Sequence, residues 1–141
     1  MKMINPYLNF DGNTEEAFNF YKSVFGGEFS TIMRFGDTPE AENVSERDKN
    51  KIMHIALPLG NRQVLMGTDA CESMGHQLKI GNNSFMALAA ESEAEAHEFF
   101  SKLSVDGNIQ VPIDKMFWGG LFGQLTDKFD MQWMITFDKN M

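Results

Sequence analysis

Two stretches of the chain carry the same amphipathic pattern. Apolar positions recur at i, i+3, i+4 and i+7 in residues 17–24 and again in residues 96–103, which is the spacing of one helix face. Asn13 and Ser92 precede the stretches, and each has Glu three residues later, the signature of a capping box. Matched positions are offset by 79 residues, as 96 is from 17. The pattern therefore predicts one duplicated unit that folds twice.

Runs of β-favouring residues surround each predicted helix and are separated by glycines and Asp-Gly pairs. The predicted strands are residues 3–10, 28–35, 52–59, 62–68, 84–90, 109–117, 120–126 and 131–137. Gly60-Asn61 predicts a hairpin, and the polar residues 36–50 predict a long surface loop. The order is β-α-β-β-β twice, with modules at residues 1–68 and 83–141 and a linker at 69–82.

Composition narrows the class of partner. The chain has 141 residues, 43% of them hydrophobic, and a net charge of −8. An acidic surface repels phosphate backbones and anionic lipid heads, so we expect neither nucleic acid nor membrane as partner. No apolar run approaches the roughly 20 residues of a membrane span, and the N-terminus lacks the apolar stretch of a signal peptide. Cys71 is the sole cysteine, which favours a cytoplasmic location.

Two segments carry a family resemblance. One contains Gly12-Asn13, Glu16-Ala17, Phe20-Tyr21 and residues 24–28; the other contains residues 117–123, 126–129 and 133–135. Together they resemble the PhnB-like branch of the vicinal oxygen chelate superfamily, which includes glyoxalase I, extradiol dioxygenases, and fosfomycin- and bleomycin-resistance proteins. The resemblance spans essentially the whole chain. It implies a single α+β domain in which curved mixed sheets of two βαβββ modules enclose a cleft, and a homodimer.

One residue departs from the branch. Asp130 stands where the branch usually has Gly after Lys-Phe. Asp tolerates a left-handed turn better than most residues, so we expect the turn to survive.

Metal-using members of the superfamily place His or Glu ligands on strands one, four, five and eight. The corresponding positions here fall near Pro6, Met66, Phe85 and Met134, and a shift of one residue brings no better ligand. Divalent catalytic ions generally need imidazole or carboxylate donors. We therefore expect no metal and no other cofactor. The alternative of Cu(I) on the two methionine thioethers competes with ordinary core packing.

Other side chains provide weaker evidence for a functional site. His54 is the only histidine on a predicted strand; it is either a cavity-facing base or donor, or a histidine bonded to backbone or solvent. Trp118 and Phe122 flank Gly119-Gly120, as a stacking wall or as a bulge beside a core tryptophan. Neither Cys71 nor any serine has an Asp or His partner at a spacing typical of a nucleophile. Some relatives carry methyltransferase names, but we find no glycine-rich strand-to-helix loop for S-adenosylmethionine.

The favoured hypothesis is a protein that binds an unassigned small molecule in an apolar cleft without a metal. Its predicted ligand contacts are Leu8, His54, Met66, Phe85, Trp118, Phe122 and Met134. Pockets of this kind need few polar groups to orient a guest. The alternative is a metal-dependent lyase, isomerase or dioxygenase of the same superfamily. A third hypothesis is a protein that assembles with partners through its sheet edges.

Overall fold

The computed structural model describes residues 1–39 and 41–140. Eight strands and two α-helices lie in these residues, and the chain divides into two compact units, Met1–Lys79 and Ile80–Met141. Each unit has the order βαβββ. The predicted α+β fold of two such modules is therefore confirmed.

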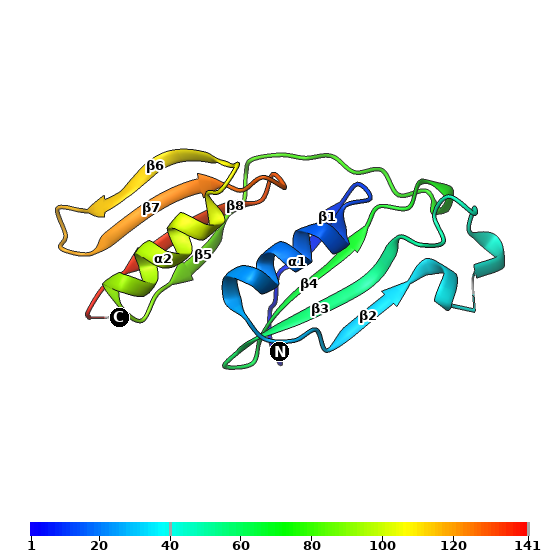
Figure 1. Cartoon of the computed structure of the whole chain (residues 1–141), viewed down its shortest axis with the longest axis horizontal. Coiled ribbons are helices and arrows are strands. Elements are labelled where there is room, and N and C mark those ends of the chain that lie inside the picture. The colour runs from blue at the N-terminus through cyan, green and yellow to red at the C-terminus, as the bar shows by residue number, and fades with distance from the viewer. Residues whose placement is uncertain (40, 141) are drawn as a thin grey trace. The chain divides into compact units, whose positions relative to one another are not determined.

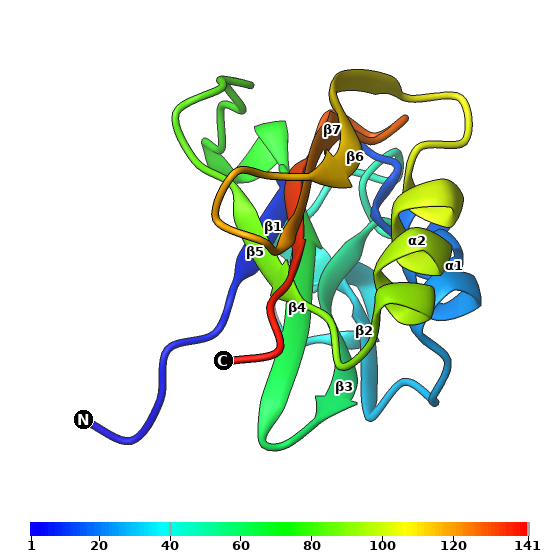
Figure 2. The same cartoon turned by 90° about the vertical axis from the view of Figure 1, so that its left-hand side faces the viewer.

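The first unit forms a mixed sheet, here sheet A. Its elements are β1 (Tyr7–Phe10), α1 (Thr14–Phe25), β2 (Thr31–Arg34), β3 (Ile52–Gly60) and β4 (Gln63–Asp69). The strand order is β1-β4-β3-β2, with β1 parallel to β4 and the other pairs antiparallel. Figures 1 and 2 show α1 lying across one face of this sheet.

The second unit repeats this topology in sheet B. Its elements are β5 (Met86–Ala89), α2 (Glu93–Leu103), β6 (Asn108–Lys115), β7 (Leu121–Thr126) and β8 (Gln132–Phe137). The order β5-β8-β7-β6, with β5 parallel to β8, matches sheet A strand for strand. All eight predicted strands are present, several of them shorter than predicted. The first begins at Tyr7, after Pro6, because proline cannot donate to a ladder.

A glycine on a central strand lets each helix approach its sheet. A Cβ added at Gly67 of β4 would lie 2.6 Å from Cε1 of Phe18 on α1. At Gly123 of β7 it would lie 2.6 Å from Cε2 of Phe100 on α2. Both rings are buried, so each helix is set by an aromatic ring packed over a strand glycine. Phe18 belongs to the buried face of α1 although the predicted stripe omitted it, whereas Phe20 is half-buried.

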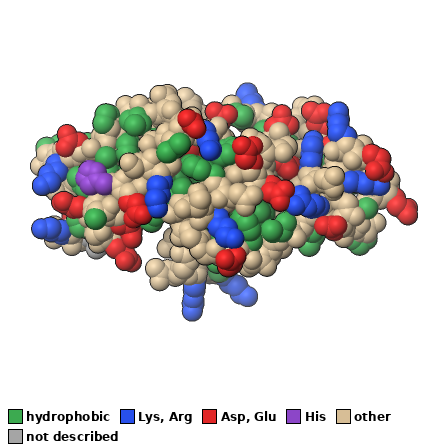
Figure 3. All heavy atoms as spheres, in the orientation of Figure 1, with side chains coloured by type: hydrophobic (Ala, Val, Ile, Leu, Met, Phe, Trp, Pro, Cys, Tyr) green, Lys and Arg blue, Asp and Glu red, His purple; other side chains and the backbone are tan. Residues whose placement is uncertain are grey.

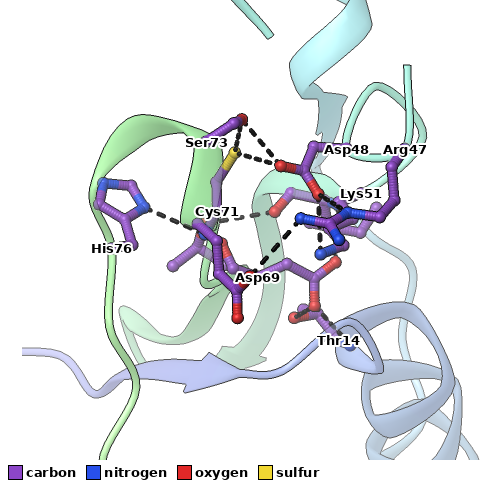
Figure 4. A network of polar contacts seen from close by, with 11 residues as sticks. Thr14, Arg47, Asp48, Lys51, Asp69, Cys71, Ser73 and His76 are labelled. Atoms are coloured by element: carbon purple, nitrogen blue, oxygen red, sulfur yellow. Dashed lines mark hydrogen bonds and ion pairs between the residues drawn. The ribbon is translucent and has the colours of Figure 1, made fainter. Parts of the chain in front are cut away.

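The start of α1 is capped differently from the prediction. Asn13 makes no side-chain cap hydrogen bond, so the predicted capping box is wrong there. Instead the buried Asp69 carboxylate, at the end of β4, accepts hydrogen bonds from the backbone N–H and the hydroxyl of Thr14 and from the N–H of Ile52 (Figure 4). The predicted cap of α2 is confirmed, because Ser92 Oγ accepts from the N–H of Glu95 at 3.0 Å.

The polar segment of residues 36–50 packs against the core rather than forming a plain surface loop. Short 3-10 turns lie at its start, Phe35–Asp37, and at Ala41–Asn43. Residue 40 lies outside the described residues. Val44 is buried and packs with Phe35 and Cys71, and Met53 joins them. The segment therefore closes the core at one end of sheet A.

The outer surface carries both signs of charge. Figure 3 shows acidic and basic side chains interspersed over the face in view, with no continuous field of one sign. Within residues 1–39 and 41–140, no helix combines the length and the apolar character needed to cross a membrane.

Candidate functional site

A buried polar network joins the segment after β2 to the segment after β4 (Figure 4). The Asp48 carboxylate lies at its centre and is fully buried. Lys51 Nζ lies 2.9 Å from Oδ1, while the Ser73 hydroxyl and the Cys71 thiol donate to Oδ2 at 2.8 and 3.4 Å. Hydrogen bonds from Lys51 and Ser73 hold the pKa of Asp48 well below its usual range, although burial opposes them. Asp48 is therefore a carboxylate at every ordinary pH.

This network joins residues that sequence spacing did not connect to Cys71. Asp48 lies 23 residues before it. The ring of His76 accepts the Cys71 N–H at 3.2 Å. The thiol is fully buried, and it donates to the Asp48 carboxylate. The geometry therefore suits a tie between two segments rather than a nucleophile.

The open face of sheet A is the second candidate. Side chains alternate between the two faces of a strand, and directly paired residues share a face. Gly67 faces α1, so its neighbour Met66 faces away from the helix, together with its strand partners Tyr7 and Ala56. His54 lies two residues from Ala56 on β3 and pairs with Met33. We call this helix-free surface the Tyr7–His54 face. Its strand residues are Tyr7, Asn9, Thr31, Met33, His54, Ala56, Pro58, Val64, Met66 and Thr68.

Tyr7 and His54 form a hydrogen-bonded, stacked pair on this face. The Tyr7 hydroxyl lies 2.9 Å from His54 Nδ1, and the ring centroids are 5.6 Å apart at an interplanar angle of 29°. Tyr7 is 45% exposed and His54 is half-buried. Burial raises the pKa of Tyr7, so the phenol is protonated at neutral pH. The pair thus offers an aromatic surface and atoms that can either donate or accept a hydrogen bond. The thioethers of Met33 and Met66 lie beside it, as the strand partners of His54 and Tyr7.

The predicted contacts of the first unit fall on different faces. His54 and Met66 lie on the Tyr7–His54 face, whereas Leu8 pairs with Gly67 and so faces α1. Tyr7, which precedes Leu8 and pairs with Met66, lies on the Tyr7–His54 face. The sequence held a signal for this: polar Tyr7 and Asn9 alternate with apolar Leu8 and Phe10, the pattern of a strand with one buried face.

The predicted contacts of the second unit are also divided. Gly123 of β7 faces α2, so its neighbours Phe122 and Gln124 face away from the helix. Met134 pairs with Gln124 and therefore lies with Phe122 on the helix-free face of sheet B. Phe85 is half-buried and immediately precedes β5.

Trp118 lies in the turn between β6 and β7 and is 45% exposed. Its ring packs against Gly120, where an added Cβ would overlap it. Trp118 is therefore not a core residue.

The side chains at the superfamily's chelate positions do not fit a divalent ion. Met66 pairs with Tyr7, one residue beyond Pro6, and Met134 pairs with Ala87. These positions offer a phenol, thioethers and a methyl group where imidazole or carboxylate donors are required. In the part of the chain that the structure describes, no group of three or more His, Cys, Asp or Glu could hold a metal. We therefore derive no chemistry through a chelated metal.

Known proteins resemble this chain in sequence and in structure over nearly its whole length. The family model described as 3-demethylubiquinone-9 3-methyltransferase matches residues 2–136. Protein YjdN of Escherichia coli (strain K12) is 28% identical over 141 residues, covering 94% of this chain and 92% of its own. Protein PA1353 from Pseudomonas aeruginosa has a solved structure with 34% identity and a TM-score of 0.87, covering 98% of both chains.

Two further solved structures place the family. The PhnB protein from Bacillus cereus is 29% identical with a TM-score of 0.76, over 97% of this chain and 100% of that one. A glyoxalase-related enzyme from Fulvimarina pelagi, at 20% identity and a TM-score of 0.64, shares the fold over 98% of this chain and 89% of that one. The chain therefore belongs to the PhnB-like family, whose model is described as 3-demethylubiquinone-9 3-methyltransferase, within the glyoxalase-like fold superfamily.

Proposed function

We propose that the chain binds a small, largely apolar molecule on the Tyr7–His54 face without a chelated metal. The observation that carries the proposal is the Tyr7–His54 hydrogen bond of 2.9 Å on a helix-free sheet face. Ligand sites are typically apolar surfaces with a few polar groups that orient the guest. Met33 and Met66 flank the pair as its strand partners, and methionine adapts its shape to a guest.

The chemistry of this face supports binding without assigning a reaction. The family model carries the name of a methyltransferase, and the Bacillus cereus protein carries that name together with the name PhnB. Helix N-termini often hold the anionic groups of cofactors through free N–H groups. Here the Asp69 carboxylate occupies the N–H of Thr14 at the start of α1, and its negative charge repels anions. This helix start does not fit such a cofactor, and the proposal includes no methyl transfer.

The methionines allow a direct test. Protein labelled with ¹³C at its methionine methyls would be titrated with a library of small aromatic and aliphatic compounds and observed by NMR. We expect the bound compounds to shift the methyl signals of Met33 and Met66, while Met74, 45% exposed on another segment, serves as an internal control. Signals are assigned by Met33→Leu and Met66→Leu. The proposal fails if no compound shifts Met33 and Met66, or if Met74 moves equally.

A matched pair of variants tests the polar contact. His54→Gln removes the imidazole from the face, and His97→Gln makes the same change at an exposed position on α2. We expect His54→Gln to weaken binding of compounds that carry a hydrogen-bonding oxygen, and His97→Gln to leave their dissociation constants unchanged. Equal effects of the two variants would contradict a site at His54.

A further inference from the structure

We infer that the Tyr7–His54 pair selects ligands that carry an oxyanion, such as a carboxylate or an enolate, and that binding takes up one proton at His54. This inference rests on the proposed binding function and names the class of ligand. It starts from the charge of the face. None of the strand residues that define the face is Asp, Glu, Lys or Arg. The ionisable groups among them are Tyr7 and His54.

Three charged residues at the ends of these strands have partners away from the Tyr7–His54 face. Arg34, at the end of β2, pairs with Glu15 on α1 at 2.8 Å, which draws it to the helix side. Lys51, just before β3, pairs with Asp48 in the buried network. Asp69, at the end of β4, receives its hydrogen bonds on the helix side from Thr14 and Ile52. A charge gained by His54 is therefore added to a face whose own strand residues include no Asp, Glu, Lys or Arg.

Protonation of His54 reverses its bond to Tyr7. When the imidazole is neutral and accepts at Nδ1, the Tyr7 hydroxyl is the donor at 2.9 Å and the imidazole proton sits on Nε2. When the imidazole is charged, Nδ1–H donates to the Tyr7 oxygen and the phenolic proton is free for a ligand. The pair then presents two donors, Tyr7 O–H and His54 Nε2–H, with a positive charge. Charge-assisted donors of this kind suit an oxyanion.

The proton balance gives the expected sign of the effect. The proton comes from solvent, adds to the imidazole and stays there while the anion is bound. Histidine is the side chain that most readily changes its charge within the physiological pH range. An anion that requires the charged imidazole would therefore bind more weakly at pH 8 than at pH 6. A neutral ligand of the same shape would show little change.

The test compares 1-naphthoate with 1-naphthamide, which share ring and size and differ in charge. Both are titrated at pH 6 and pH 8 while the Met33 and Met66 methyl signals are followed. Calorimetry in two buffers of different ionisation enthalpy measures proton uptake. Naphthoate is ionised at both values, because an ordinary carboxyl titrates near pH 4. We expect naphthoate to bind severalfold more weakly at pH 8 than at pH 6, with net proton uptake on binding, and less than a twofold change for naphthamide.

Variants separate the two members of the pair. His54→Gln should remove the pH dependence and leave naphthoate at its weak pH 8 affinity, and His97→Gln should behave as wild type. Tyr7→Phe keeps the ring but removes one donor, so naphthoate should bind several-fold more weakly at pH 6 with its pH dependence retained. The inference is overturned if naphthoate does not bind, or if its pH dependence equals that of naphthamide. The proposed binding function would still hold in that case if neutral compounds bind and shift the methyl signals of Met33 and Met66.

Discussion

The Asp69 carboxylate should be the strongest single polar contributor to the stability of the first unit. It is 2% exposed and accepts from the Ile52 N–H at 2.8 Å and from the Thr14 N–H at 3.0 Å, as well as from the Thr14 hydroxyl. The bonds join the ends of α1, β3 and β4. Asp69→Asn retains one oxygen for Thr14 but turns an amide NH₂ toward the Ile52 N–H, so that two donors face each other in a buried place.

The size of the loss follows from the bonds involved. A hydrogen bond to a charged group contributes about 1.5–3 kcal/mol, and an unsatisfied buried donor costs about 1–3 kcal/mol. We therefore expect Asp69→Asn to lower the free energy of unfolding by about 3 kcal/mol, or Tm by about 10 °C for a chain of this size. Asp69→Ala orphans all three donors and should cost more, about 5 kcal/mol.

Urea unfolding followed by far-ultraviolet circular dichroism measures these differences. Asp11→Asn is the matched control, because it makes the same change at an exposed residue shortly before α1 and should stay within about 0.5 kcal/mol. Asn13→Ala should also be nearly neutral, since Asn13 makes no side-chain cap bond. A stability of Asp69→Asn within about 1 kcal/mol of wild type, or a loss for Asn13→Ala as large as that for Asp69→Asn, would refute the role of Asp69 as the cap of α1.

Three further predictions concern other parts of the fold. Ser92→Ala removes the hydrogen bond to the Glu95 N–H and should cost about 1 kcal/mol in urea unfolding; a change as small as that of Asn13→Ala would contradict the cap. Gly67→Ala places a Cβ 2.6 Å from a Phe18 ring atom and should cost about 2 kcal/mol by thermal unfolding. Gly81→Ala, with its nearest atom at 3.9 Å, is the control and should be close to neutral; equal losses would refute the close approach. The pKa of Asp48 is lowered in the fold from an ordinary value of 3.8, so its stabilisation is present above about pH 4 and is lost as pH falls through the folded pKa. Asp48→Asn should therefore be less stable than wild type at pH 7, and the gap should narrow in acid; a gap that widens below pH 4 would contradict this sign.

The duplicated fold could be predicted because its signals are local. Helix periodicity, strand alternation and turn residues each act over a few positions, and they gave the order of all ten elements. The cap of α1 could not be predicted in the same way. Asp69 and Thr14 are 55 residues apart, and the nearby Asn13 and Glu16 supplied a plausible local cap that the tertiary contact replaces.

The candidate site also has a part that local sequence predicts and a part that depends on tertiary contacts. Met66 and His54 were identified from their strands, but the bond between Tyr7 and His54 spans 47 residues and depends on the register of two strand pairs. A register change of one residue moves a side chain to the other face. Tyr7 and its neighbour Leu8 therefore lie on opposite faces of sheet A.

The most direct test of metal-free binding uses protein that has been treated with a chelator and verified by elemental analysis to be free of metal. A compound that shifts methionine methyl signals in untreated protein would be titrated into this sample. We expect the Met33 and Met66 signals to shift with an unchanged dissociation constant. Shifts that disappear in the metal-free protein and return on adding a divalent ion would contradict it.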